Sequence, residues 1–379
     1  MLRIYLYLIL AASVSALATD MIVPALPLLQ EAFTTDYSAI QLTISGFLVI
    51  YAASQLFSGF LGEKLGKLRV LTASFLLFLA GSLLCFMSDS LMMLLAGRAL
   101  QALGAGAGPV LSKAIAKETF SPLTLKRALS DISSASAVVP LIAPLAGAAL
   151  LGYLSWNSIF LVMALFSVVT LVLSPRRLEQ HDAAAAPSSS GFITPAFIQG
   201  TLLVSLILSS LFCYISLSPA IFMQQLGLST MHYSLLFSAS VLFFIIGNQI
   251  AKFERIINPW ILFILNALAV TPFIIGSHSL LLCIAGSMIF NLTLGAYYPS
   301  ANFIALQIKG SKTGIAASVT GFIQTVSAGA ISYFAVKLTD TGMGFDRTLG
   351  ASTLTLAILS VLVVTTMKVT QWKTGKKGK

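Results

Sequence analysis

Long apolar runs alternate with short polar breaks from one end of the chain to the other. The runs lie near residues 4–26, 40–61, 70–88, 91–112, 129–152, 157–174, 197–223, 233–251, 259–276, 279–301, 313–336 and 350–368. A helix needs roughly 20 apolar residues to cross the hydrocarbon core of a bilayer. The runs are continuous and lack the alternation of a membrane β-barrel, whose strands span about ten residues. The pattern therefore predicts twelve transmembrane helices.

The longest polar break divides the predicted helices into two sets of six. Its sequence, "SPRRLEQHDAAAAPSSSG", is charged and then rich in Ala, Pro and Ser, which is typical of a linker. We expect an N-terminal six-helix bundle over 1–174 and a cytoplasmic linker over 175–196. A C-terminal six-helix bundle with a basic cytoplasmic tail would occupy 197–379. Two repeated bundles form the layout of many secondary transporters.

Composition supports an all-α polytopic membrane protein. Hydrophobic residues make up 57% of the 379 positions, charged residues only 9%, and the mean hydropathy is +0.95. About a quarter of the residues in a soluble protein are charged. The three cysteines fall inside apolar runs, the three histidines lie at or near run ends, and no CxxC motif is present. The sequence therefore predicts neither a metal site nor a cofactor.

Basic residues predict the orientation of the helices. With the N-terminus placed inside, nearly all lysines and arginines outside the spans fall on the inner side, and only Lys337 and Arg347 fall outside. Such a bias marks the cytoplasmic loops. It predicts that both termini are cytoplasmic, and it explains the net charge of +10 without a nucleic-acid partner. Binding of the tail "KTGKKGK" to anionic lipid is an alternative role for those charges.

The first apolar run has a second interpretation as a secretory signal. Arg3 supplies a basic start, and "ALA" at 16–18 fits a cleavage site. The apolar character continues to Leu29, however, and removal of the segment would leave an odd number of spans. We therefore expect a retained first helix.

Two charged residues, Asp20 and Arg98, stand out within the predicted spans, where a charge normally faces a cavity or a partner. At 1.5 Å per residue, Asp20 lies roughly 24 Å up a hydrocarbon core about 30 Å thick. Arg98, in the fourth span, lies roughly 10 Å below the outer face by the same rise. The two depths are similar, so the side chains are expected to pair or to share a water-filled cavity.

A carboxyl group in such a cavity can take up a proton and release it when a cationic or polar substrate enters, which is what a proton-coupled antiporter requires. Pro24 and Pro27 support an alternative, in which Asp20 only caps a helix that ends at the interface. Asp131 is a weaker candidate for carrying protons, and we interpret it as an interfacial cap or loop partner.

Several stretches resemble the major facilitator superfamily, and in particular its twelve-helix drug:proton antiporter branch of the Bcr/CflA type. "TDMIVPALP" resembles the first-helix signature of that branch, and "GFLGEKLGKLRVL" resembles the superfamily loop between helices two and three. In this loop an acidic residue and basic residues lie between glycines that let helices approach closely. Glu63 replaces the usual Asp, so the expected contact with a neighbouring helix end is made by a longer side chain. The matching loop positions are Gly59, Gly62, Glu63, Lys64, Gly66 and Lys67.

The fourth and fifth spans extend the resemblance. "GRALQALGAGAG" is similar to the RxxQGxG pattern of the branch at Arg98, Gln101 and Gly104, and the resemblance implies that Arg98 serves proton coupling. "VPLIAPLAGAA" is similar to the antiporter motif at Pro144 and Gly147. The stretches at 214–229 and 314–324 resemble the seventh and eleventh helices. Ala102 and Asn157 depart from the pattern.

The resemblance implies a proton-coupled exporter of small amphipathic compounds, drugs included, that works by alternating access in a bacterial inner membrane. It also implies a monomer driven by the proton gradient without a cofactor. A dedicated exporter of one metabolite, such as a siderophore, fits the sequence as an alternative. A membrane enzyme or channel fits it less well, because no cluster of catalytic residues and no filter repeat is present. Candidate cavity-lining residues are Gln101, Tyr214, Ser218, Asn291 and Tyr297.

Overall fold

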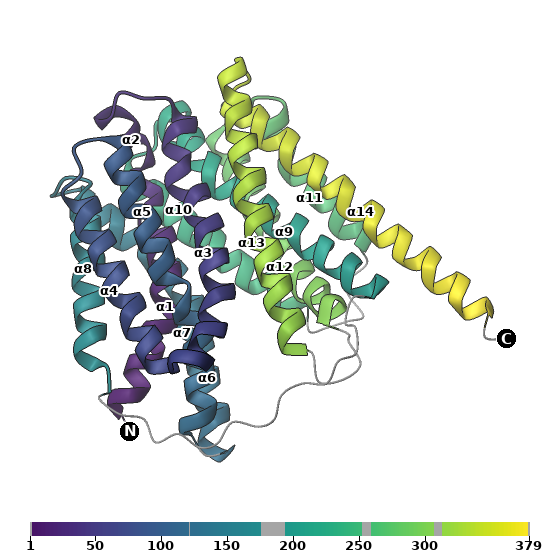
Figure 1. Ribbon diagram of the computed structural model, residues 1–379. Coiled ribbons are helices and arrows are strands. Elements are labelled where there is room, and N and C mark those ends of the chain that lie inside the picture. Colours follow the sequence, from purple (N-terminus) through teal and green to yellow (C-terminus); the bar gives the residue numbers. More distant parts are fainter. Residues whose placement is uncertain (1, 121, 176–193, 252–258, 307–312, 378–379) are drawn as a thin grey trace. The chain divides into compact units, whose positions relative to one another are not determined.

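A computed structural model describes residues 2–120, 122–175, 194–251, 259–306 and 313–377 (Figure 1). Nearly all of the predicted linker lies outside these residues. The side chain of Asp131 also lies outside the described part, although its backbone belongs to a helix.

Most of the described residues in the first half of the chain are helical. Its helices are α1 (Leu2–Asp20), the 3₁₀ turn η1 (Val23–Ala25), α2 (Leu26–Ala32), α3 (Tyr37–Leu65), α4 (Lys67–Phe86), α5 (Leu91–Ala105), α6 (Ala107–Thr119), α7 (Pro122–Leu151) and α8 (Ser158–Leu173). Three of these segments, α1, η1 and α2, together make the first predicted span. The fourth span consists of α5 and α6.

The second half repeats this helical organisation. Its helices are α9 (Pro195–Pro219), the π-helical segment η2 (Ala220–Gln225), α10 (Thr230–Ile250), α11 (Pro259–Ile274), α12 (Leu280–Leu306), α13 (Thr313–Lys337), the 3₁₀ turn η3 (Leu338–Thr341) and α14 (Phe345–Lys377). Each predicted span of this half therefore coincides with one of the helices α9 to α14.

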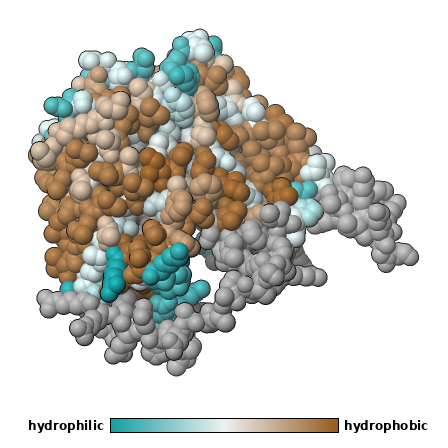
Figure 2. Space-filling view, in the orientation of Figure 1, coloured by the Kyte–Doolittle hydropathy of each residue, from teal (hydrophilic) through white to brown (hydrophobic). Residues whose placement is uncertain are grey.

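The helices have the length and composition of membrane spans. Among the described residues, nine helical segments are long and apolar enough to cross a bilayer, and three further apolar helices are shorter. Together they match the twelve predicted spans and confirm the all-α polytopic fold. Figure 2 shows a broad hydrophobic surface in brown, with hydrophilic residues in teal toward the ends of the helices.

Three breaks within spans were not predicted in detail. The first helix ends at Asp20 and resumes at Leu26, after a short turn and the 3₁₀ segment η1, which contains Pro24. The fourth span is interrupted at Gly106, between α5 and α6. The seventh span passes into the π-helical segment η2 directly after Pro219, which lacks the backbone N–H that a regular helical turn requires.

The chain forms two compact units. The first comprises residues 1–186 together with 228–238, and the second comprises residues 187–227 together with 239–379. The beginning of α10 thus groups with the first unit, while the rest of α10 groups with the second. Within the first unit, α1 packs against α6 and α7, and α4 packs against α5 and α8. Within the second, α12, α13 and α14 pack around the largely buried α9.

Glycine allows the closest of these helix approaches. A Cβ atom added to Gly104 in α5 would collide with the backbone of α4 at Ser74 and Phe78. Small residues serve this purpose in membrane bundles, where van der Waals packing rather than the hydrophobic effect drives helix association. Gly46 in α3, in contrast, has open space where its Cβ would lie.

These two glycines provide a matched test of the packing. We expect Gly104→Ala to destabilise the protein by roughly 1–3 kcal/mol through overpacking. Gly46→Ala should be neutral or slightly stabilising, because alanine favours a helix by roughly 1 kcal/mol over glycine. Thermal unfolding of both purified variants in detergent would measure the difference. Equal stability of the two variants would contradict the packing described for α4 and α5.

Candidate functional site

Asp20 is the last residue of α1, and it is buried inside the first unit with 7% of its surface exposed. The residues that follow it, from Met21 to Leu26, are buried as well, and the span continues to Ala32. Asp20 therefore lies within a buried span. Asp20 ends α1, so the alternative in which it only caps a helix at the interface stays a prediction beside the proton-carrier role.

The environment of Asp20 offers its carboxyl group little stabilisation. Thr19 Oγ1 lies 3.2 Å from Asp20 Oδ1, but this hydroxyl also bonds the carbonyl oxygens of Ser15 and Ala16. No basic side chain among the described residues makes an ion pair with Asp20. A buried carboxyl group without a fixed cation can hold a proton or exchange it when another charge approaches.

The helix break after Asp20 packs against the antiporter-like motif of α7. A Cβ atom on Gly147 would collide with the carbonyl oxygen of Met21, so α7 touches the first unit's helix break directly. Pro144 lies one turn earlier within α7. The structure thus brings together the first-helix stretch around Asp20 and the α7 stretch with Pro144 and Gly147, which the sequence suggested separately.

Arg98 joins three helices at membrane depth. Its side chain is 1% exposed, and Nε donates to the Thr43 carbonyl oxygen of α3 at 3.0 Å. Its Nη1 donates to the Ala18 carbonyl oxygen of α1 at 3.0 Å and to Gln101 Oε1 at 2.8 Å. The guanidinium group also lies 4.3 Å from the centroid of the Phe47 ring, at cation–π distance.

Gln101 extends this network to two further helices. Its Nε2 donates to Ser82 Oγ of α4 at 2.8 Å and approaches Met163 Sδ of α8 at 3.5 Å. Since Gln101 is fully buried, these bonds fix the orientation of its amide and leave the amide oxygen for Arg98. Gln101 therefore positions the guanidinium group in this structure and is part of the Arg98 cluster.

The structure places Arg98 beside α1 at nearly the level of Asp20. The carbonyl that Arg98 bonds belongs to Ala18, two residues before Asp20, so the similar depth predicted from the sequence is reproduced. The two charged groups make no ion pair, however, in the described part of the chain. One guanidinium nitrogen, Nη2, is buried without a hydrogen-bond partner among the described residues. Arg98 therefore has donor capacity that this arrangement leaves unused.

The loop between α3 and α4 carries a charge bridge. Lys67 Nζ lies 2.9 Å from Glu63 Oε1 and 2.6 Å from Glu118 Oε1, near the end of α6. Glu63 thus contacts the first residue of α4, and Lys67 continues the link to α6. Gly66 forms the turn with a φ of +92°, which strongly favours glycine.

The residues at the end of α3 serve packing. A Cβ on Gly62 would press against Leu111 of α6, and the Cβ of a residue at Gly59 would touch Val110. Lys64 Nζ lies 4.4 Å from the centroid of the Phe60 ring. Asn157, which stands where the family pattern has a basic residue, donates to the Phe86 carbonyl oxygen.

Tyr214 and Asn291, two of the predicted cavity residues of the second half, lie near each other between α9 and α12. The Tyr214 hydroxyl bonds Ser240 Oγ at 3.0 Å, and its ring lies 5.8 Å from that of Phe290. Asn291, next to Phe290, donates to the Ser287 carbonyl oxygen. Ser218 is fully buried in α9.

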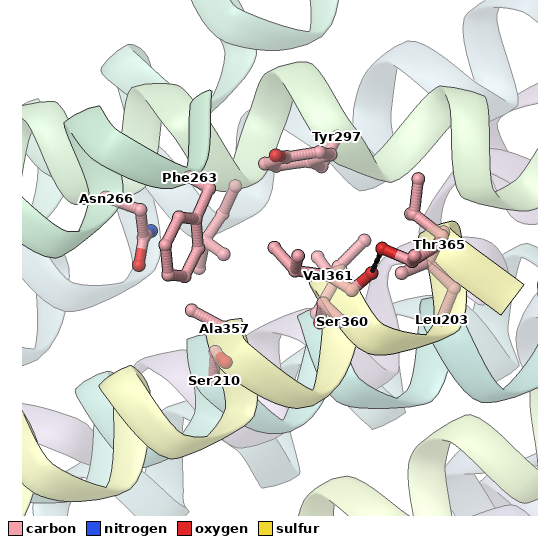
Figure 3. Close-up of a pocket in the computed structure, with 12 residues that line it drawn as sticks. Leu203, Ser210, Phe263, Asn266, Tyr297, Ala357, Ser360, Val361 and Thr365 are labelled. Atoms are coloured by element: carbon pink, nitrogen blue, oxygen red, sulfur yellow. Dashed lines mark hydrogen bonds between the residues drawn. The ribbon is translucent and has the colours of Figure 1, made fainter. Parts of the chain in front are cut away.

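Tyr297 lines a cavity of about 80 Å³ inside the second unit (Figure 3). The cavity lies between α9, α11, α12 and α14, and its walls are mostly apolar. Asn266 contributes the main buried amide: its Nδ2 donates to Thr293 Oγ1, and its Oδ1 has no partner among the described residues. The arrangement suits a small apolar group that carries one hydrogen-bond donor.

No group of three or more His, Cys, Asp or Glu residues in the described part of the chain could hold a metal ion. The functional groups that the structure assembles are therefore one buried carboxyl group, one buried guanidinium group and the polar residues that hold them.

Comparison with known proteins decides the family. The sequence profile of the Major Facilitator Superfamily matches residues 8–335. The chain belongs to this superfamily. It is a polytopic membrane transporter of small molecules, and not an enzyme.

Curated relatives of this transporter are distant. It is 27% identical over 342 residues to YdgK of Bacillus subtilis, described as an uncharacterized MFS-type transporter, with 85% of each chain covered. It is 24% identical over 225 residues to the multidrug resistance protein MdtL of Salmonella paratyphi B. That match covers 57% of each chain, so the transporter aligns with little more than half of MdtL.

Solved transporters share the fold at low sequence identity. A bacterial homologue of the human lysosomal transporter Spinster, inward-facing and unoccupied, matches with a TM-score of 0.74 and 14% identity, covering 95% of this chain and 94% of that one. A D-xylose–proton symporter matches with a TM-score of 0.74 and 13% identity, covering 95% and 97%. These likenesses confirm the superfamily fold.

Two important contacts were missed by the sequence analysis. Glu118 completes the Lys67 bridge, and Phe47 covers the guanidinium group of Arg98. An acidic residue in the basic stretch "KAIAKETF" was an available signal for Glu118. Nothing in the sequence distinguishes Phe47 from the other phenylalanines, because its role depends on how α3 packs against α5.

A double-mutant cycle tests the bridge between α4 and α6. We expect Lys67→Met and Glu118→Gln to show a coupling energy of roughly 0.5–2 kcal/mol, because the two side chains are only 13% and 20% exposed. The control cycle pairs Lys64→Met with Glu118→Gln, since Lys64 lies over Phe60 instead, and its coupling should be near zero. Thermal unfolding in detergent would measure both cycles. Similar coupling energies in the two cycles would contradict a specific bridge.

Proposed function

We propose that this transporter is a proton-coupled antiporter of the Bcr/CflA type that exports small amphipathic compounds, including drugs. The observation that carries the proposal is the buried carboxyl group of Asp20, which has no ion-pair partner among the described residues and lies at the level of the buried Arg98. An ionisable residue within a membrane span is a strong candidate for a functional group.

The coupling step exchanges a proton for a positively charged or polar substrate. In the protonated state, Asp20 is neutral and is compatible with its buried position at the end of α1. When a cationic substrate approaches, the carboxylate form becomes favourable and the proton is released. The unused Nη2 donors of Arg98 provide a second way to stabilise the carboxylate once Asp20 has lost its proton.

The helix break gives the Asp20 region room to change conformation. Because α1 ends at Asp20, its last carbonyl groups are not locked into a continuous helix, and η1 begins after two intervening residues. Gly147 allows α7 to pack on this break without an intervening side chain. In alternating access, the two halves would rock so that this region faces each side of the membrane in turn.

The class of cargo is supported by similarity to a multidrug resistance protein and by the cavity at Tyr297. MdtL carries that description, although the alignment covers only part of it. The apolar walls and few hydrogen-bonding groups of the cavity suit one apolar group of an amphiphilic compound, since about 80 Å³ is less than a whole drug-sized ligand needs. We further propose that the transporter acts as a monomer without a cofactor, in a bacterial inner membrane with both termini in the cytoplasm.

Asp20→Asn tests the proton carrier. Asparagine keeps the size of the side chain but cannot release a proton, so we expect a pH gradient to drive no accumulation of a lipophilic cationic dye in everted vesicles. Glu31→Gln is the matched control, because it neutralises an exposed carboxyl group on α2 and should leave accumulation unchanged. Membrane abundance of both variants would be checked by immunoblot. Coupled accumulation by Asp20→Asn at the wild-type rate would exclude Asp20 as the proton carrier.

Arg98→Lys tests the contribution of the guanidinium group. Lysine retains the positive charge, but it cannot reproduce the three hydrogen bonds that join α1, α3 and Gln101. We expect a loss of stability of roughly 1.5–3 kcal/mol, the typical strength of a hydrogen bond to a charged group. Dye accumulation should also depend less steeply on the pH gradient. Unchanged coupling in a folded Arg98→Lys protein would show that a positive charge alone suffices.

A further inference from the structure

An open depression of about 640 Å³ lies at the end of the first unit where α1 begins and α8 ends. The first turns of α4 form its other side. It lies at the opposite end of α1 from the Asp20 region, because α1 runs from Arg3 in the depression to Asp20.

Two arginines give the depression a positive charge. Arg69 of α4 is exposed and makes no hydrogen bond or ion pair within the described residues. Arg3 of α1 bonds the carbonyl oxygens of Val172, Leu173 and Ser174 at the end of α8 through Nε and Nη2. None of the described residues that line the depression is acidic. The positive charge is therefore not balanced within the site.

Hydroxyl groups and apolar side chains continue the surface away from the arginines. Thr72 and Ser174 lie next to each other, with their hydroxyl oxygens 3.4 Å apart. Beyond them, Leu76 and Val172 line the depression and are 54% and 67% exposed. Both belong to helices with the composition of membrane segments, so their exposed faces are suited to contact lipid chains.

We propose that this depression binds the headgroup of an anionic phospholipid. The phosphate would lie between Arg69 and Arg3, and one acyl chain would pass over Leu76 and Val172. Guanidinium groups bind phosphate oxygens through paired hydrogen bonds, and basic pockets at the ends of membrane helices bind anionic headgroups. The order of charged, hydroxyl and apolar groups along the surface follows the order of phosphate, glycerol and acyl chain in a phospholipid.

This chemistry favours an anionic lipid over a zwitterionic one. In phosphatidylcholine, the phosphate is balanced by its own ammonium group, and the depression offers no carboxylate to receive that ammonium. In phosphatidylglycerol, the phosphate carries a net charge that the headgroup does not balance, and Thr72 and Ser174 lie where the ester oxygens of the backbone glycerol can accept hydrogen bonds. The site lies outside the proposed proton pathway, so lipid binding and proton coupling can be tested separately.

Native mass spectrometry of the full-length protein in detergent tests the site. The protein would be titrated with phosphatidylglycerol and with phosphatidylcholine of identical acyl chains, and inorganic phosphate would be added as a soluble competitor. We expect the first phosphatidylglycerol to bind at least roughly tenfold more tightly than phosphatidylcholine, a difference of about 1.4 kcal/mol. Inorganic phosphate at the same concentration should not displace it.

Variants locate the binding to this depression. Arg69→Gln should remove most of the preference for phosphatidylglycerol, and Arg69→Lys should retain part of it because the charge remains. Lys113→Gln removes an exposed basic residue of α6 that does not line the depression, and the preference should be unchanged. Arg3 is not substituted, because it also holds the end of α8. Size-exclusion chromatography would verify that each variant is folded.

Three results would overturn the proposal. Equal affinity of the wild-type protein for the two lipids would show that the site does not recognise the phosphate charge. An equal loss in Arg69→Gln and Lys113→Gln would show that total surface charge is responsible. Displacement of the lipid by equimolar inorganic phosphate would indicate a site for free phosphate.

Discussion

The first unit depends on a positive charge buried at membrane depth. Arg98 is almost inaccessible, and no carboxylate in the described part of the chain neutralises it by an ion pair. A buried unpaired charge is strongly destabilising unless polar groups surround it. The carbonyls of Ala18 and Thr43, the amide of Gln101 and the ring of Phe47 take this role. The packing of α1, α3 and α5 is therefore tied to a single guanidinium group.

The same constraint connects the proposed proton-coupling residues to helix geometry. Arg98 holds α1 at Ala18, just before the helix ends at Asp20, and Gly147 brings α7 against the backbone immediately beyond. A change in the charge of Asp20 would therefore act on the two contacts that fix the position of α1, namely the Arg98 bond to Ala18 and the packing of Gly147 on Met21. Coupling a proton to a helix movement requires such a contact, since a ligand shifts a conformational equilibrium only through a difference in interaction between the two states.

Much of this architecture could be predicted from the sequence, because membrane spans are determined by the length of apolar runs. The same arithmetic placed Asp20 and Arg98 at similar depths. The break at Gly106 and the π-helical segment after Pro219 could not be predicted, since both depend on local backbone packing. Glu118 and Phe47 were missed because their roles come from contacts between helices that are distant in sequence. Tyr297 lines a cavity of the second unit whose lining does not include Tyr214, and the sequence could not predict that lining because it depends on how four helices pack together.

The central claim is that substrate and proton compete through Asp20. The most direct measurement is the proton release of purified transporter in weakly buffered detergent solution when a lipophilic cationic substrate is added. The account predicts that the wild-type protein releases protons in proportion to the substrate bound, and that an Asp20→Asn protein binds the substrate without proton release. Proton release of equal size from both proteins, or none from the wild type at saturation, would contradict it.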